Sequence, residues 1–384
     1  MTNTTLAARL GLFLWVVMVL LIGREIAFEP THRTVVDSYL LGANRWLDGI
    51  SLYSGSHGFI YMPAFAVLFT PFTVLPDVVV ALLWRICLVL TYFYALSQLV
   101  KILIKQSDQY WQWFGLVSLI ALPIAFSGLR NGQMNVLLSA VMVIATAWLI
   151  QERWTASSVL LALIMSLKPT FAVYFLLAVA LYKPLWWRVP PVLLAFLSIP
   201  LLVGGIDYGI QQYINFYHMG QEAMTLGIEE PNWATFFNIM PQLFNVYVPE
   251  SVQLLIKLPL ALLTFWYCYR CKRFSDPITT GMVMLTLACC YHMLFNPRSV
   301  NTDYVILGSV LAFWFAAANG LWHDRVLALL VGLNALMVLE AYELSKLITP
   351  EHHSWINPVA TLLFTGLVFW QLNTGKRFKT PLQS

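Results

Sequence analysis

The chain has 384 residues, of which 59% are hydrophobic and only 10% are charged, and its mean hydropathy is +0.72. Soluble domains carry about a quarter charged residues, so this composition places the chain in a lipid bilayer. The net charge of +4 comes without a clustered basic run of the kind that follows a nucleic-acid backbone. Nucleic acid is therefore excluded as a partner.

The first apolar segment has its hydrophobic core from Leu10 to Ile22, followed by Gly23-Arg24-Glu25. No small-residue cleavage pattern follows it, and many further apolar stretches come after. We therefore expect a first helix that is retained rather than a signal peptide that is removed.

Apolar stretches long enough to cross, or nearly cross, about 30 Å of hydrocarbon recur along the chain. We expect an all-α, polytopic membrane protein with about twelve transmembrane helices, near residues 6–22, 59–75, 78–100, 112–127, 134–150, 156–180, 190–206, 252–269, 278–295, 304–319, 326–344 and 356–372. The even number predicts that both termini lie on the same side. No repeat or linker divides the sequence, so residues 1–384 are expected to form a single integral-membrane domain.

The distribution of Lys and Arg among the connections predicts the orientation. With the N-terminus inside, the inner segments carry many basic residues, namely Arg9, Arg130, Lys183, Arg188, Arg270, Lys272, Arg273, Arg325, Lys376, Arg377 and Lys379. The longest outer loop, residues 207–251, has five acidic residues and neither Lys nor Arg. Residues 23–58 then also lie outside, so two long loops share the outer face. We expect a multi-pass protein of the cell (inner or plasma) membrane with both termini in the cytoplasm.

The first outer loop is polar, aromatic and longer than a connection between helices requires. It contains the candidate acids Asp37 and Asp48 together with Tyr39, and Tyr61 follows close behind. A solvated loop with surface ion pairs, each worth about 1 kcal/mol or less, is the structural alternative. A carboxylate that faces a lipid-anchored substrate can take the proton from an attacking sugar hydroxyl. Asp37 and Asp48 are therefore the candidate catalytic bases, and we interpret this region as part of an active site.

Two further polar clusters interrupt apolar runs. The first contains Arg130, Gln133 and Asn135 around Gly132, which permits a tight backbone turn. Its amides are suited to line a cavity or to bridge helices. The second is Lys168-Pro169, inside the predicted 156–180 span. A buried Lys in a membrane helix is costly, so it should face a cavity or an anionic partner such as a phosphate.

The last cluster follows the predicted 278–295 span and reads Asn296-Pro-Arg-Ser-Val-Asn-Thr-Asp-Tyr304. Arg298 is suited to bind a phosphate through two parallel hydrogen bonds. A structural pair between Arg298 and Asp303 is the alternative. The adjacent His352 and His353 point in different directions on most backbones, so they do not suggest a metal site, and no cofactor is expected.

The order of these motifs resembles glycosyltransferase family 87, the polyprenyl-phosphate-mannose-dependent α-1,2-mannosyltransferase-like membrane enzymes of GT-C fold. The resemblance covers most of the chain and rests on a first-loop acid and Tyr39, Trp46-x-x-Gly49-x-x-x-Tyr53, Phe59-x-Tyr61-x-Pro63, Pro71, Pro76, Trp84-Arg85, the 130–135 cluster, Lys168-Pro169 and Asn296-Pro-Arg298.

The resemblance implies that a monosaccharide, mannose or similar, is moved with inversion from a polyprenyl-phosphate donor to a lipid or glycan acceptor at the outer face. A first-loop Asp would act as base. The substrate-binding residues would be Tyr39, Tyr61, Arg130, Gln133, Asn135, Lys168 and Arg298. The family Asp usually lies about four residues before the loop Tyr, where this chain has Val35, whereas Asp37 lies two residues before Tyr39.

Two other functions remain as alternatives. A transporter or flippase of lipid-linked glycans should have paired repeats with broken helices and charges near the midplane, and no such repeat is found. A catalytically inactive family member that only binds the donor would fit the displaced Asp. The sequence leaves the sugar, the acceptor and the length of the lipid carrier open.

Overall fold

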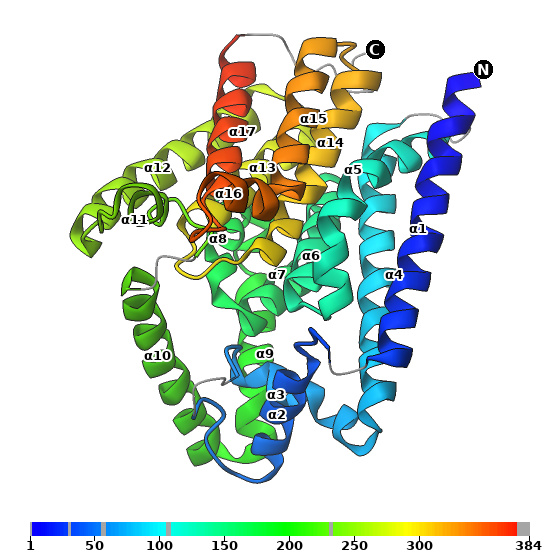
Figure 1. Cartoon of the computed structure of the whole chain (residues 1–384). Helices are drawn as coiled ribbons and strands as arrows, with labels where there is room; N and C mark the ends of the chain where they lie inside the picture. Colours follow the sequence, from blue (N-terminus) through cyan, green and yellow to red (C-terminus); the bar gives the residue numbers. More distant parts are fainter. Residues whose placement is uncertain (1, 30–31, 55–58, 105–108, 230–232, 375–384) are drawn as a thin grey trace.

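The computed structural model describes residues 2–29, 32–54, 59–104, 109–229 and 233–374, and in this part of the chain every regular element is a helix (Figure 1). One large hydrophobic cluster extends from Trp15 in the first helix to Val368 in the last. The expected all-α class is confirmed.

Six helical segments of the described chain are long and apolar enough to cross a membrane. They are α1 (Thr2–Phe28), α4 (Asp77–Leu103), α5 (Tyr110–Asn131), α12 (Glu250–Phe274), α13 (Pro277–Phe295), and η5 (Asn301–Tyr304) with α14 (Val305–Gly320). A seventh results if α15 (Arg325–Leu339) and α16 (Ala341–Ile348), which are bent by 73°, count as one span. About twelve were expected, so the structure supports a membrane protein without reaching that number of full-length spans.

The other expected spans form shorter helices or do not reach the same apolar length. They are α6 (Met134–Ile150), α7 (Trp154–Leu167), α8 (Ala172–Leu181), α9 (Val189–Gly204) and α17 (Ile356–Asn373). The beginning of α1 and the end of α17 lie at the same end of the molecule (Figure 1).

Residues 59–75 do not form a spanning helix. They contain α3 (Pro63–Phe69) and η1 (Thr70–Val74), which together rise about 20 Å, less than the hydrocarbon thickness. Pro71 is the second residue of the 3₁₀ helix and Pro76 precedes α4, so a regular α-helix cannot continue through them. Instead, α3 lies with α2 (Val36–Leu47) across one end of the bundle (Figure 1).

Because α3 does not cross the membrane, helices α4, α5 and α6 run opposite to the expected direction. Helices α1 and α5 are parallel, since Gly11 lies against Gly115 and the carboxylate of Glu25 lies 3.7 Å from Arg130. Arg130 therefore lies at the end of the molecule that carries the first loop, and its expected place on the inner side was wrong.

The expected 156–180 span is two helices. Residues before proline disfavour the α conformation, and Lys168 has φ −148° and ψ 93° before η3 (Pro169–Phe171). The rings of Trp154, at the start of α7, and Tyr182, just after α8, are 5.8 Å apart. Helices α7 and α8 thus form an antiparallel hairpin, and Lys168 lies at its tip instead of in the middle of a span.

Both long loops contain helices. Residues 23–58 include the end of α1 and the amphipathic α2, whose buried residues Val36, Tyr39, Leu40, Ala43 and Trp46 recur at helical spacing. Residues 207–251 include α11 (Ile239–Phe244) and most of α10 (Ile206–Glu229). Gln212 of α10 accepts a hydrogen bond from the Leu52 backbone at 3.0 Å, so α10 contacts the first loop. Residues 55–58 and 230–232 lie outside the described part.

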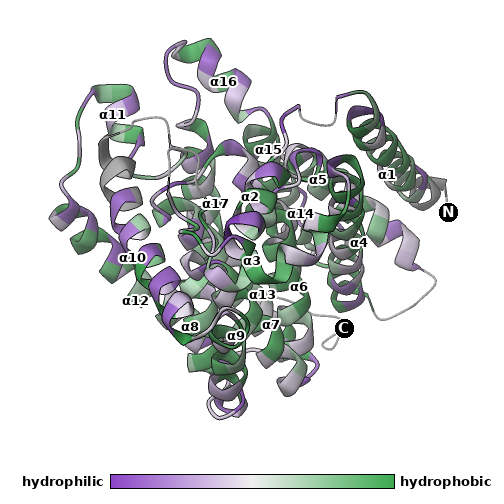
Figure 2. Cartoon of the chain, turned by 90° about the horizontal axis from the view of Figure 1, so that it is seen from below, coloured by the Kyte–Doolittle hydropathy of each residue, from purple (hydrophilic) through white to green (hydrophobic). Residues whose placement is uncertain are grey.

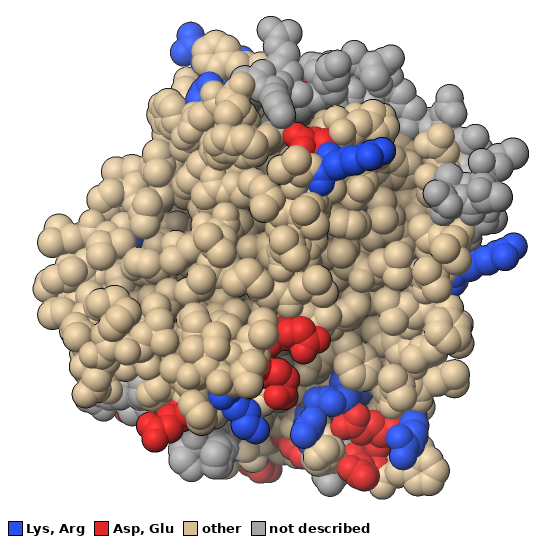
Figure 3. Space-filling view, turned by 45° about the horizontal axis from the view of Figure 1, so that its top comes forward, with Lys and Arg blue, Asp and Glu red and all other residues tan. Residues whose placement is uncertain are grey.

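The surface is that of a protein surrounded by lipid. Leu20 and Leu255 are 67% and 72% exposed on α1 and α12, and hydrophobic residues dominate α1 and α4 in Figure 2. Figure 3 shows a broad area without charge between groups of charged residues. The short helix α16 buries Ala341 and Ser345 and exposes Leu347 and Ile348.

Candidate functional site

Asn135 is the centre of a buried polar chain at the start of α6. Its side-chain Oδ1 accepts a hydrogen bond from Lys168 Nζ at 2.9 Å, and its Nδ2 donates to Asp303 Oδ1. The other carboxylate oxygen of Asp303 accepts from the Val300 backbone N at 3.0 Å. Three segments far apart in the sequence thus place a cation and a carboxylate around one amide.

The turn between α5 and α6 holds Asn135 in place. Gly132 ends α5 in the left-handed region, with φ +73°, and a Cβ there would lie only 3.0 Å from Val36. Its carbonyl accepts hydrogen bonds from the Trp84 indole at 2.8 Å and the Tyr39 hydroxyl at 3.3 Å. Helices α2 and α4 therefore fix the turn that carries Gln133 and Asn135.

Aromatic side chains form a wall beside Lys168. Its ammonium lies 5.7 Å from the centre of the Tyr61 ring, a cation–π distance. The hydroxyls of Tyr39 and Tyr61 are 3.4 Å apart, and the rings meet edge to face. The Met62 backbone N donates to the Leu167 carbonyl at 3.0 Å, which ties this wall to the tip of the α7–α8 hairpin.

The Lys168 ammonium has no carboxylate partner within ion-pair distance in the described part of the chain. Lys168 is linked to Asp303 only through Asn135, and the Lys168 residue is half-buried. Beyond it, Phe171 stacks on the His292 ring at 4.3 Å, and His292 Nδ1 lies 3.0 Å from the Thr170 carbonyl oxygen. A cation enclosed in this way is suited to an anionic group of a substrate.

The two candidate acids lie apart from each other. Asp37 is in the first turn of α2 and Asp48 follows its last residue, a rise of about 16 Å, and both are exposed. Asp37 lies two residues before Tyr39, so the two side chains leave the helix in nearly opposite directions. The structure therefore brings Tyr39, Tyr61, Asn135 and Lys168 together, and leaves Asp37 and Asp48 outside this cluster.

The surroundings of Asp37 change its acidity. Partial burial raises the pKa of its carboxyl above the ordinary value, the nearby Asp77 raises this pKa further, and Arg85 lowers it. At the other end of α2, burial raises the pKa of the Tyr208 hydroxyl, and the charge of Asp48 adds to that shift.

The two candidate arginines have partners outside the Lys168 cluster. The Arg130 Nε lies 3.7 Å from a Glu25 carboxylate oxygen. The Arg298 guanidinium lies 4.5 Å above the Trp233 ring. The structural alternative of an Arg298–Asp303 ion pair is not found among the described residues, because Asn135 and the Val300 backbone bind that carboxylate instead.

Reasoning from sequence missed the role of Asp303 as the partner of Asn135. The two residues are 168 positions apart, and no local pattern connects them. Within the described residues, no group of three or more His, Cys, Asp or Glu side chains is placed to hold a metal ion.

Long apolar helices around the buried polar chain Lys168–Asn135–Asp303 define the class as a polytopic, all-helical membrane protein. The sequence model of glycosyltransferase family 87 matches residues 59–297, more than half of the chain, so this protein belongs to glycosyltransferase family 87. The comparisons with curated proteins and with solved structures give no match. The family indicates a glycosyltransferase, which acts on a sugar donor and an acceptor in or at the membrane.

The matched segment divides the candidate residues. It contains Tyr61, Arg130, Gln133, Asn135 and Lys168. The first-loop residues Asp37, Tyr39 and Asp48 precede it, and Arg298 and Asp303 follow it.

Proposed function

We propose that this protein transfers a monosaccharide, mannose or a similar sugar, from a polyprenyl-phosphate donor to a hydroxyl of a lipid or glycan acceptor. The observation that carries the proposal is the chain Lys168–Asn135–Asp303, which holds a cation and a carboxylate at the ends of apolar helices. The proposal includes a GT-C type fold, a plasma-membrane location, cytoplasmic termini and a site on the outer face.

Lys168 would bind the phosphate of the donor. The bond between the sugar C1 and the phosphate oxygen breaks, and the electron pair leaves with the phosphate. A cation close to that oxygen stabilises the charge that develops on it. Asn135 positions Lys168, Tyr61 encloses it, and Arg298 supplies a second cation at the rim.

The acceptor hydroxyl oxygen would attack C1 from the side opposite the phosphate, which inverts the configuration. Its proton must go to a base as the new bond forms. We assign this role to Asp37 and rank Asp48 second. The assignment requires the acceptor hydroxyl to reach the face of α2 opposite Tyr39, and the raised pKa of Asp37 then brings this carboxylate closer to the working pH. Asp303 is the third acid, although both of its oxygens accept hydrogen bonds within the protein.

Membership of a glycosyltransferase family favours transfer over the alternative of a flippase. A catalytically inactive family member would still bind the donor, so only a measurement of sugar transfer distinguishes it from an active enzyme. The decisive experiment is to incubate the purified protein in nanodiscs with a panel of polyprenyl-phosphate sugars and to measure sugar release by mass spectrometry. Release of one sugar that stops in the Lys168→Gln variant supports the proposal. If the donor binds but no sugar is released with any acceptor that is added, the protein is a catalytically inactive family member.

A further inference from the structure

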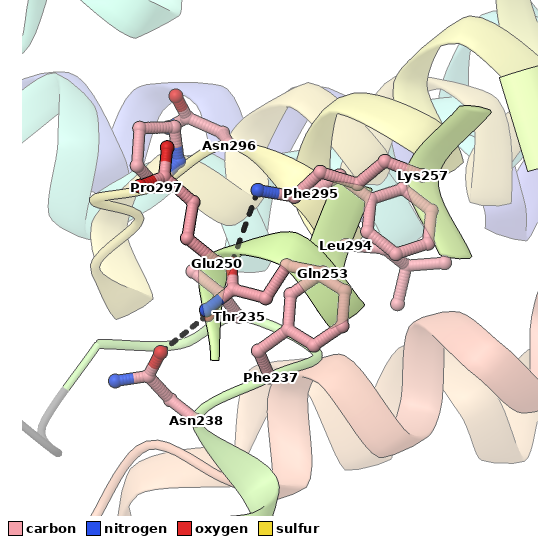
Figure 4. Close-up of a pocket in the computed structure, with 10 residues that line it drawn as sticks. All are labelled: Thr235, Phe237, Asn238, Glu250, Gln253, Lys257, Leu294, Phe295, Asn296 and Pro297. Atoms are coloured by element: carbon pink, nitrogen blue, oxygen red, sulfur yellow. Dashed lines mark hydrogen bonds between the residues drawn. The ribbon is translucent and has the colours of Figure 1, made fainter. Parts of the chain in front are cut away.

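A pocket lies between residues 235–238, which precede α11, the start of α12 and the end of α13, and none of its lining residues belongs to the Lys168 cluster (Figure 4). Its empty volume is about 520 Å³, its open mouth included. Phe237, Leu294 and Phe295 form its apolar wall and belong to a hydrophobic cluster separate from the main core. Half of its polar lining residues, Glu250, Gln253 and Lys257, come from one face of α12.

Lys257 is the unusual residue of this pocket, because it lies within an apolar helix that is long enough to cross the membrane. Its ammonium donates to Gln253 Oε1 at 3.2 Å and lies 5.2 Å from the Phe237 ring centre. No carboxylate pairs with it among the described residues. A charged side chain at such a position calls for an anionic partner.

The two charges of the pocket follow a defined order along α12. Glu250 is exposed in the first turn, and Lys257 lies about 10 Å further along the helix axis. Because Lys257 reaches back to Gln253, its charge is drawn toward the water boundary. The Glu250 carboxylate is therefore the charge nearer to the water, and the Lys257 ammonium lies deeper toward the hydrocarbon.

The lipid boundary lies beside this pocket. Leu254, Leu255 and Leu258, on the neighbouring face of α12, are 54%, 72% and 55% exposed. A phospholipid next to them would have its phosphate nearer the hydrocarbon and any terminal amine nearer the water. That order of charges is complementary to Lys257 and Glu250.

We propose that this pocket binds the headgroup of a zwitterionic phospholipid with a primary amine, such as phosphatidylethanolamine. The phosphate binds Lys257 and the Gln253 amide, and the ammonium donates to Glu250. The acyl chains lie along the exposed leucines of α12. Asn296 and Pro297 line the same pocket and lead directly to Arg298, so the bound lipid lies beside the segment that connects to the proposed site.

The test measures lipid retention and needs no turnover. The purified protein is exchanged into nanodiscs with equal amounts of phosphatidylethanolamine, phosphatidylcholine and phosphatidylglycerol, and retained lipids are counted by native mass spectrometry. We expect phosphatidylethanolamine to be enriched. Lys257→Gln should weaken its retention roughly tenfold, as for loss of a hydrogen bond to a charged group. Glu250→Gln should remove the preference over phosphatidylglycerol, while Lys257→Arg should retain it.

Matched controls come from α16, where Glu343 and Lys346 are exposed and do not line the pocket. Glu343→Gln and Lys346→Gln should leave the lipid pattern unchanged. Equal retention of all three lipids by the wild type would overturn the proposal. Enrichment of phosphatidylglycerol that depends on Lys257 alone would show a simple anion site instead, and displacement by inorganic phosphate would show that the lipid part is not recognised.

Discussion

Lys168 and Asp303 bind opposite ends of a single amide group, that of Asn135. The amide oxygen accepts from the ammonium at 2.9 Å, and the amide nitrogen donates to the carboxylate. An asparagine satisfies both charged groups at once without neutralising either, which neither an acidic nor a basic residue could do. The position of Lys168 therefore depends on a residue in the turn that α2 and α4 hold.

Asn135→Ala should lower turnover roughly ten- to a hundredfold. Both charged groups lose a hydrogen bond, each worth about 1.5–3 kcal/mol, and Lys168 loses its fixed position. Ser139→Ala is the matched control, because Ser139 lies one turn along α6 and donates to the Val305 carbonyl at 3.3 Å without contact to Lys168. Equal turnover in the two variants, measured at equal expression, would show that Asn135 has no part in the reaction.

Lys168→Gln and Arg298→Lys should both weaken donor binding. The first removes the charge at the hairpin tip, and about a tenfold loss is expected for one charge-assisted contact. The second keeps the charge but loses the planar group that stacks on Trp233. Lys183→Gln, exposed at the far end of the bundle, is the control. If both site variants bind a polyprenyl-phosphate sugar as the wild type does, these cations do not contact the donor.

Asp37→Asn should abolish most turnover and preserve donor binding. The substitution keeps the size of the side chain and removes the base, whose contribution is typically about a hundred- to ten-thousandfold. Asp48→Asn and Asp303→Asn complete the set. Loss of turnover in Asp48→Asn alone would identify Asp48, at the other end of α2, as the base. A loss confined to Asp303→Asn would place the base beside Asn135.

Asp77→Asn should move the acidic limb of the pH–rate profile to lower pH. A base acts in its deprotonated form, so the rate falls as the pH drops through its pKa. Burial and Asp77 raise the pKa of Asp37, so removing the Asp77 charge lowers that pKa and extends activity toward acid. An acidic limb that stays in place when Asp77 is replaced would mean that Asp37 does not set it.

Cysteine labelling tests the topology that follows from α3. A Cys at Glu222 on α10 should react from outside intact cells, and a Cys at Gln151, between α6 and α7, only after permeabilisation. Both side chains are exposed, and Cys87, the exposed native cysteine, should first be replaced by Ser. The reverse result would invert the proposed orientation, and labelling of both from outside would contradict the direction of α6.

Much of the fold follows from hydrophobic runs, and the deviations have local causes. Helices α4, α6 and α13 lie where unbroken apolar stretches predict them. The three prolines at 63, 71 and 76 should have excluded a span at 59–75, and Pro169 should have ended the helix at Lys168. Each error came from giving hydropathy more weight than proline.

The candidate site was less accessible to sequence reasoning. Helical spacing within α2 would have shown that Asp37 and Tyr39 face different directions, had the segment been recognised as a helix instead of a loop. Asn135, Lys168 and Asp303 were each found as polar residues near apolar runs. Their hydrogen bonds join three distant segments, and a contact of that kind depends on how helices pack rather than on any local pattern.

The 73° bend before α16 has a mechanical consequence. An amphipathic helix with Leu347 and Ile348 exposed is suited to lie in the membrane interface. It leads into residues 349–355, where the His353 carbonyl accepts from Asn301 at 3.4 Å, two residues before Asp303. A short stretch of chain and one hydrogen bond thus connect the bent helix to the turn that holds the carboxylate facing Asn135.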